Sequence, residues 1–239
     1  MRHRNYYVQH KTKKNRIRWY ILGLPLLFMS IIAVTSLFFS MRVLENETMA
    51  PNLYAGERFV FSSYKFYSFI PWLDMEKGTL PFGRGHIILV NLFNEEDHTL
   101  FNRILDKALR FISIQRFSLI EQNQNSFVKR VIGLPGDEII MTNYLIRVRT
   151  QASPYSLTEF ELTEQNYTTI IPTLSELWDS SLPFSGNMER IVLKDNEIFL
   201  LSDDRSNTND SRTWGPVPIK NIAGRAVFRY WPLNRLGRP

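Results

Sequence analysis

Residues 127–140 read FVKRVIGLPGDEII. Both ends of this stretch are rich in β-branched and other apolar residues, which favour strands. Between the ends, Leu134-Pro135-Gly136-Asp137 places proline and glycine at the two central positions of a type II turn. The stretch therefore predicts a strand, a tight turn and a second strand. Similar apolar runs at 87–91, 197–202 and 224–230 predict further strands, so the chain beyond residue 42 is predicted to be mainly β.

Lys129 and Arg130 lie in the first of these strands, where alternation directs them to opposite faces. Apolar neighbours on both sides of Lys129 would disfavour its ammonium form and lower its pKa. A lysine with a lowered pKa can accept a proton near neutral pH. The other interpretation of the same two residues is a solvated pair of surface charges.

A second stretch, NETMAPNLYAGE at 46–57, contains a hydroxyl that such a base could serve. Thr48 precedes Pro51, which fixes the backbone, and Gly56-Glu57 predicts a turn. A threonine hydroxyl becomes a nucleophile only when a base takes its proton. Because the chain has only four histidines, Lys129 is the natural base for Thr48.

The N-terminal part predicts a membrane anchor. Residues 1–18 carry seven of the 29 basic residues and no acid, which leaves 22 basic against 23 acidic residues elsewhere. Residues 19–41 contain no charge and are long enough for a helix to cross a bilayer. The positive-inside rule then places 1–18 in the cytoplasm and 42–239 outside. The alternative, a cleaved signal peptide, would have a shorter apolar region that ends in small residues.

Composition excludes several other classes of protein. The body is near neutral, so the net charge of +6 does not indicate a nucleic-acid partner. Cysteine is absent, which excludes disulfides, thiolate zinc sites and a cysteine nucleophile. The histidines fall in no ligand spacing, so we expect neither metal nor cofactor. Residues 99–112 have the periodicity of a helix, which either lies on anionic lipid or packs on the body.

The sequence resembles the bacterial type I signal peptidases, which are membrane-anchored enzymes with a serine–lysine dyad. The family pattern Ser-Met-x-Pro-Thr-Leu-x-x-Gly-Asp aligns with residues 48–57, and Lys-Arg-x-x-Gly-Leu-Pro-Gly-Asp matches residues 129–137. The pattern Gly-Asp-Asn-Arg-x-x-Ser-x-Asp-Ser-Arg-x-Trp-Gly-x-Val-Pro is similar to residues 202–218. The resemblance implies a signal-peptidase-like β-sheet or barrel domain, with a variable β excursion at about 141–190, behind one transmembrane helix.

By position, the resemblance implies Thr48 as the nucleophile and Lys129 as the general base. Asn46 would contribute to the oxyanion pocket, and Met49 and Phe127 would border the substrate pockets. Four residues would support the site: Thr208, which would orient the lysine, and Asp210, Arg212 and Arg130, which would form an ion-pair network. The sequence departs from the family at Thr48 for serine, Asn52 for threonine, Glu57 for aspartate, Ser202 for glycine and Asp204 for asparagine.

Two functions follow as expectations. In the first, the protein removes signal peptides from exported preproteins after small residues at −1 and −3, through an acyl-enzyme. In the second, it is a catalytically silent relative that binds signal peptides or partner subunits. A third class, the self-cleaving repressors with a serine–lysine dyad, does not fit the predicted membrane span. Expected partners are preproteins, the bilayer and the export translocon, with the protein in the bacterial cytoplasmic membrane.

Overall fold

The computed structural model describes residues 20–28, 30–31, 35, 38–63, 80–92, 102, 105–106, 109, 126–173 and 186–239. The chain divides into two units, Met1–Phe38 with His98–Glu121, and Phe39–Asp97 with Gln122–Pro239. In the first unit, residues 20–28 are helical, and so are Asn102, Leu105, Asp106 and Leu109. The rest of the predicted helix at 99–112 lies outside the described residues.

The predicted anchor needs a correction at its end. Residues 39–41 belong to β1 (Phe39–Val43), an antiparallel strand that pairs with β2 (Arg58–Ser63) from Phe39↔Ser62 to Val43↔Arg58. The ladder between these strands satisfies backbone groups that a helix would pair internally, so no helix extends to Met41. Residues 19, 29, 32–34 and 36–37 of the predicted anchor lie outside the described residues. Within the described residues, no helix has the length and apolar character that crossing a membrane requires.

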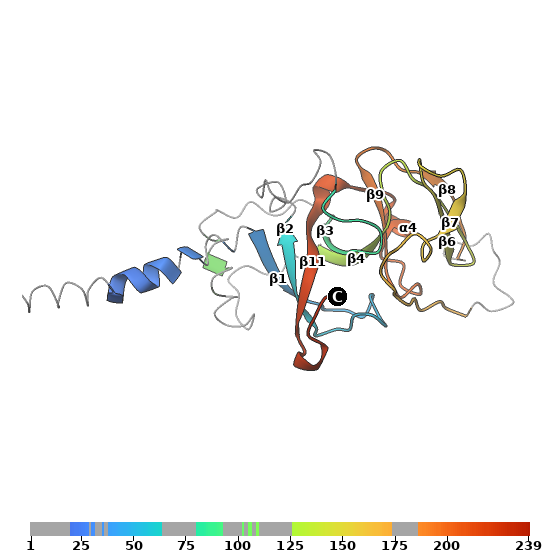
Figure 1. The fold of residues 1–239 in the computed structure, drawn as a ribbon. Coiled ribbons are helices and arrows are strands. Elements are labelled where there is room, and N and C mark those ends of the chain that lie inside the picture. Colours follow the sequence, from blue (N-terminus) through green and yellow to red (C-terminus); the bar gives the residue numbers. More distant parts are fainter. Residues whose placement is uncertain are drawn as a thin grey trace, which may run out of the picture. The chain divides into compact units, whose positions relative to one another are not determined.

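The second unit is mainly β, as predicted, and its described residues form two sheets (Figure 1). The larger sheet has seven strands in the order β1-β2-β11-β3-β4-β9-β10. Its remaining members are β3 (Ile87–Asn91), β4 (Ser126–Gly133), β9 (Glu197–Leu201), β10 (Val217–Pro218) and β11 (Ile222–Trp231). Among the described residues of this unit, the helices are α4 (Ser211–Trp214), η1 (Ile219–Asn221) and η2 (Leu233–Arg235).

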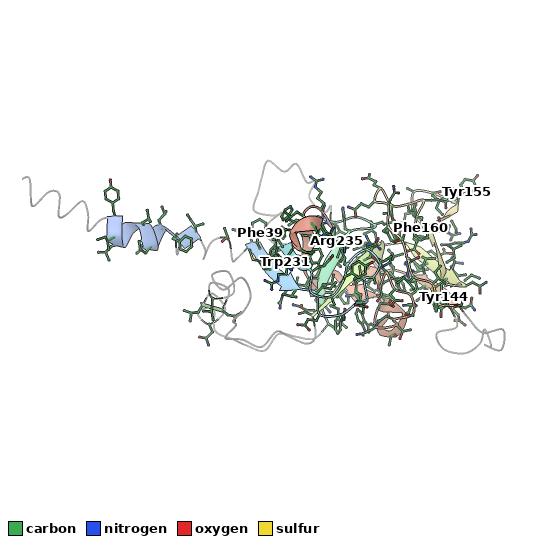
Figure 2. All side chains as sticks on the ribbon, turned by 90° about the horizontal axis from the view of Figure 1, so that it is seen from below. Phe39, Tyr144, Tyr155, Phe160, Trp231 and Arg235 are labelled. Carbon is green, nitrogen blue, oxygen red and sulfur yellow. The ribbon has the colours of Figure 1, made fainter. Side chains whose placement is uncertain are left out.

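The smaller sheet has four strands in the order β7-β6-β5-β8. These are β5 (Glu138–Thr142), β6 (Leu145–Arg149), β7 (Ser156–Thr158) and β8 (Met188–Val192). The predicted excursion at about 141–190 therefore forms a sheet of its own, together with β5. Figure 2 shows Tyr144, Tyr155 and Phe160 at this end of the unit, and Phe39 and Trp231 at the opposite end.

The predicted turn at 134–137 connects the two sheets. The N–H of Asp137 donates to the carbonyl of Leu134 at 3.1 Å, and Gly136 has a φ of 78°, as a type II turn requires. The carboxylate of Asp137 accepts from the N–H of Leu134 at 2.7 Å and pairs with Arg84. The two predicted strands are present, but they do not pair with each other, since β4 and β5 belong to different sheets.

In the described part of the second unit, buried residues form three apolar clusters. One lies beneath the loop that carries Thr48 and includes Leu44, Met49 and Leu53 with residues of β2, β3 and β11. A second cluster surrounds Ile88, Val131 and Leu200. The third, which includes Ile132, Ile139 and Phe199, packs the smaller sheet against β4 and β9. The first and third clusters fix the Thr48 loop and the Lys129 strand, respectively.

Candidate active site

Thr48 lies in the loop between β1 and β2. Its side chain is almost entirely buried, and its hydroxyl donates to Oδ1 of Asn46 at 2.9 Å. Backbone bonds close the loop at its base, where the N–H of Leu44 donates to the carbonyl of Glu57 at 2.9 Å. The carbonyl of Thr48 also accepts from the N–H of Asp204 at 3.1 Å. The loop is therefore attached to the segment that follows β9.

Lys129 lies in β4 and is 1% exposed. Its Nζ donates to Oγ of Ser202 at 2.8 Å and lies 5.8 Å from the centroid of the Trp214 ring. The pKa of Lys129 is lowered from 10.5 to about 8. Burial is the largest cause; the carboxylate of Asp210 opposes it, the charge of Arg212 adds to the lowering, and Asp203 opposes it more weakly than Asp210. The surface-pair interpretation of Lys129 is therefore wrong, and the buried, proton-accepting interpretation is consistent with the structure.

Segment Ser202–Asp204 contacts both Lys129 and Thr48. Ser202 contacts Nζ of Lys129, and Asp204, two residues later, binds the backbone of Thr48. Among the described residues no hydrogen bond joins Oγ1 of Thr48 to Nζ of Lys129, because the threonine hydroxyl donates to Asn46 instead. The predicted oxyanion donor Asn46 is thus an acceptor for Thr48 through its Oδ1.

The hydroxyl that contacts Lys129 is not the predicted one. Among the described residues, no hydrogen bond links the Thr208 side chain to Lys129, and the backbone carbonyl of Thr208 accepts from Thr213 Oγ1 at 2.6 Å. The contact comes from Ser202 because β4 and β9 are antiparallel and pair Arg130 with Leu201. The next residue along each of the two strands is then Lys129 on one and Ser202 on the other. In this structure the hydroxyl in contact with Lys129 is that of Ser202, and the role of Thr208 stays a prediction.

Asp210 and Arg212 form the predicted ion pair. The guanidinium of Arg212 donates to Asp210 at 2.9 Å from Nε and at 2.8 Å from Nη2. It also donates to the backbone carbonyls of Arg205 and Asn207. Asp210 in turn accepts from the N–H of Ser202 at 3.0 Å. The pair thus fixes the backbone of the residue that contacts Lys129.

Arg130, which was predicted to belong to the ion-pair network with Asp210 and Arg212, pairs with Asp203. Two guanidinium nitrogens of Arg130, Nε and Nη2, donate to the Asp203 carboxylate, Nε at 2.7 Å. The third nitrogen, Nη1, donates to the carbonyl of Gly85 at 2.6 Å. The Tyr167 ring lies 4.1 Å from the guanidinium carbon. Arg130 and Asp203 are both buried, so this ion pair holds the segment after β9 against β4.

The departures at Asn52 and Glu57 have structural partners. Nδ2 of Asn52 donates to Asp203 at 2.8 Å and to the carbonyl of Thr168 at 2.7 Å. Glu57 is buried and pairs with Arg229 at 3.1 Å and with Arg235. Both residues therefore tie the Thr48 loop to other parts of the unit.

The two predicted substrate residues have different surroundings. Met49 is fully buried in the core beneath the Thr48 loop, so in this structure it is a core residue. Phe127 is half-buried, and its ring centroid lies 5.1 Å from that of Trp214. Pairing of β4 with β9 begins at Arg130, so on that side Ser126–Val128 have no strand partner among the described residues. The substrate contacts of Met49 and Phe127 stay predictions.

Comparison with known proteins shows the family of this chain. The family model for signal peptidase, peptidase S26, matches residues 16–231. The chain belongs to this signal peptidase family. A signal peptidase I of Leptolyngbya laminosa is 34% identical over 50% of the chain and 50% of that protein, so this match spans half of the relative. A probable signal peptidase I-1 of Synechocystis is 25% identical over 90% of the chain and 85% of that protein.

Other matches have the same family name. A signal peptidase I of Bacillus caldolyticus is 34% identical over 51% of the chain and 64% of that protein. Among solved structures, a signal peptidase I of Enterococcus faecalis V583 covers 60% of the chain and 94% of that structure at 19% identity. Its TM-score of 0.31 is too low to support an argument about this chain.

Two residues of this signal peptidase site were not assigned a role from the sequence. Ser202 and Asp203 lie inside the motif at 202–218, and Ser202 stood out only as a departure from the family glycine. Their contacts depend on the pairing of β4 with β9, residues about 70 positions apart in the chain. The motif marked the segment, but only the register identifies Ser202 and Asp203 as the partners of Lys129 and Arg130.

Proposed function

We propose that this protein is a membrane-anchored endopeptidase that removes N-terminal signal peptides from exported preproteins. The observation that carries the proposal is the buried Lys129, whose pKa is lowered to about 8, next to the segment that binds Thr48. A buried lysine of this kind is a proton acceptor near neutral pH. The family membership and the names of the relatives support the substrate class.

In the proposed reaction, the proton of the Thr48 hydroxyl passes to Nζ of Lys129 while Oγ1 attacks the scissile carbonyl carbon. The backbone N–H of Thr48 and the amide of Asn46 stabilise the oxyanion. When the C–N bond breaks, Lys129 returns the proton to the leaving amine, and an ester to Thr48 remains. A water gives a proton to Lys129 as its oxygen attacks the ester carbon. The C–O bond to Thr48 then breaks, and Lys129 returns the proton to Oγ1, which restores the threonine hydroxyl and the neutral amine.

Substrate binding would use the free side of β4. An extended peptide can add to an unpaired strand through main-chain hydrogen bonds, which suits Ser126–Val128. Phe127 would then border the pocket for a small side chain at −1 or −3. Residues 19–38 would form the anchor, with 1–18 in the cytoplasm and the β unit on the outer side of the bacterial membrane. The bilayer and the export translocon are the proposed partners there.

One observation favours a second function, that of a silent relative that binds signal peptides or partner subunits. The Thr48 hydroxyl donates to Asn46, so catalysis requires Oγ1 to turn toward Lys129. The methyl group of threonine restricts this rotation about χ1. If the rotation is blocked, the free side of β4 would bind a signal peptide without cleavage.

Thr48→Ser distinguishes the two functions. We expect the wild-type chain, purified in detergent, to cleave a model preprotein after an Ala-x-Ala sequence, and the serine variant to cleave it up to about tenfold faster because the methyl group is lost. Product mass and initial rate are the measurements. Cleavage by the serine variant alone would support the silent relative. Absence of cleavage by both forms would remove the peptidase proposal.

The pH dependence of kcat tests the role of Lys129. With a pKa of about 8, the base is neutral in roughly a tenth of molecules at pH 7. Below pH 8, kcat should therefore rise nearly tenfold per pH unit, and above pH 8 it should level off. The measurement is initial rate at saturating preprotein from pH 6 to pH 9.5. A flat profile over this range would contradict the lysine base.

A further inference from the structure

The side chain that contacts Lys129 has a role that the family pattern does not supply, because the family has glycine at this position. Nζ of Lys129 donates to Oγ of Ser202 at 2.8 Å, and neither side chain is more than 1% exposed. We propose that Ser202 is the positioning residue of the lysine base, which holds Nζ in the orientation that accepts the proton of Thr48. This proposal rests on the proposed function of Lys129.

The surroundings of Ser202 make its hydroxyl a fixed partner. Its backbone N–H donates to Asp210 at 3.0 Å, and Asp210 is held by Arg212. The next residue, Asp203, is held by Arg130. Two buried ion pairs therefore fix the backbone on which the Ser202 hydroxyl sits, so the hydroxyl cannot follow a lysine that moves.

A neutral amine has two N–H groups and one lone pair. Oγ of Ser202 accepts one N–H of Lys129, and the centroid of the Trp214 ring lies 5.8 Å from Nζ. These contacts limit rotation of the amine, which leaves the lone pair for the Thr48 hydroxyl. Without the hydroxyl of Ser202, Nζ would sample orientations in which the lone pair points elsewhere, and a misplacement of about 1 Å can cost about a hundredfold in rate.

Ser202 also has a defined effect on the protonation of Lys129. A hydrogen bond from the ammonium to Oγ stabilises the charged form, and so does the charge of Asp210, against the desolvation that disfavours it. Removal of the hydroxyl should lower the pKa of Lys129 below its present value. The rise of kcat with pH should then shift to lower pH while the plateau falls, a combination that loss of folded protein alone does not produce.

The test compares Ser202→Ala with Ser211→Ala in the full chain in detergent. Ser211 is a matched control because it is equally buried, but its hydroxyl accepts from the N–H of Leu200 at 3.0 Å and not from Lys129. For Ser202→Ala we expect the plateau kcat to fall about tenfold to a hundredfold, KM to stay within about twofold, and the pH limb to move to lower pH. Ser211→Ala should leave the position of the pH limb unchanged.

An unchanged plateau and pH limb in Ser202→Ala would overturn the proposal. Ser202→Gly, which also lacks the hydroxyl and fills less space, serves as a second variant if the alanine protein does not fold. Equal shifts in Ser202→Ala and Ser211→Ala would also overturn it, because the effect would then come from loss of any buried serine.

A second measurement separates this inference from the proposed function. In a Thr48→Ala background, the pKa of Lys129 can be followed by NMR of ¹³C-labelled lysine, with the Lys129→Arg spectrum as the assignment. We expect Ser202→Ala to lower this pKa and Ser211→Ala to leave it in place. If the wild type cleaves no preprotein but the pKa falls as expected, the Lys129–Ser202 coupling stands and the peptidase proposal fails. If the wild type cleaves but the pKa does not change, only the Ser202 proposal fails.

Discussion

Lys129→Met should reduce preprotein cleavage by at least about a thousandfold, because the substitution removes the proposed base. Methionine has a similar length and brings no charge into a site that is 1% exposed. The fold should therefore survive the change. The measurement is single-turnover cleavage of a model preprotein at pH 8.5, where most of the wild-type lysine is neutral.

Lys194→Met is the control for this variant. Lys194 is 78% exposed and pairs with Glu197 at 3.3 Å on the surface, so the same chemical change there should alter cleavage by less than about twofold. Circular dichroism and the thermal transition of both variants check that folding is intact. If Lys129→Met kept a tenth or more of the wild-type rate, another group would be the base and the threonine–lysine mechanism would be wrong.

Much of the secondary structure could be predicted from local sequence. The strands at 87–91, 197–202 and 224–230 were predicted from short apolar runs and correspond to β3, β9 and β11, because strand preference is a property of a few adjacent residues. The type II turn could be predicted because only glycine readily adopts the positive φ of Gly136. The end of the apolar run at 39–41 was misread as helix because hydropathy does not distinguish a helix from a strand that pairs with a distant partner.

The arrangement of these strands could not be predicted in the same way. β11, near the end of the chain, lies between β2 and β3, and β4 and β5 separate into different sheets although only a turn joins them. Such pairings join residues far apart in sequence and depend on which faces bury the most apolar surface. The third apolar cluster shows the reason for the separation, because Ile139 of β5 packs against Ile132 and Phe199 across the two sheets.

The same limit explains what was predicted and missed in the site. Lys129, Asp210 and Arg212 were identified by motif, and the ion pair of the last two is local, two residues apart. Ser202 and Asp203 were missed as partners because their contacts follow from the register Arg130↔Leu201. A one-residue shift of that register would place different residues opposite Lys129. The register, and not the position of Thr208 in the family motif, therefore determines which hydroxyl contacts Lys129.

Arg130→Met and Asp203→Asn should each lower the free energy of unfolding by about 3–5 kcal/mol. Each change leaves one charge of a buried pair without its partner, since Arg130 and Asp203 have side chains that are 3% and 1% exposed. Asn52 contacts the same carboxylate, and the Tyr167 ring stacks on Arg130, so the effect should extend to both flanking segments. The measurement is the urea transition of the full chain in detergent, followed by tryptophan fluorescence.

The double variant decides between loss of a favourable pair and exposure of an unpaired charge. If the cost comes from a buried charge without a partner, Arg130→Met combined with Asp203→Asn should be less destabilised than the sum of the single variants by at least about 1 kcal/mol. Arg190→Ala is the surface control, because Arg190 is 58% exposed in its pair with Glu138 and should cost less than about 1 kcal/mol. If the single variants cost no more stability than Arg190→Ala, the Arg130–Asp203 pair does not hold the segment after β9.

The same variants should also reduce cleavage. Ser202 and Asp204 flank Asp203 and contact Lys129 and Thr48, respectively, so a loosened segment disturbs both residues. Arg190→Ala should leave the cleavage rate unchanged.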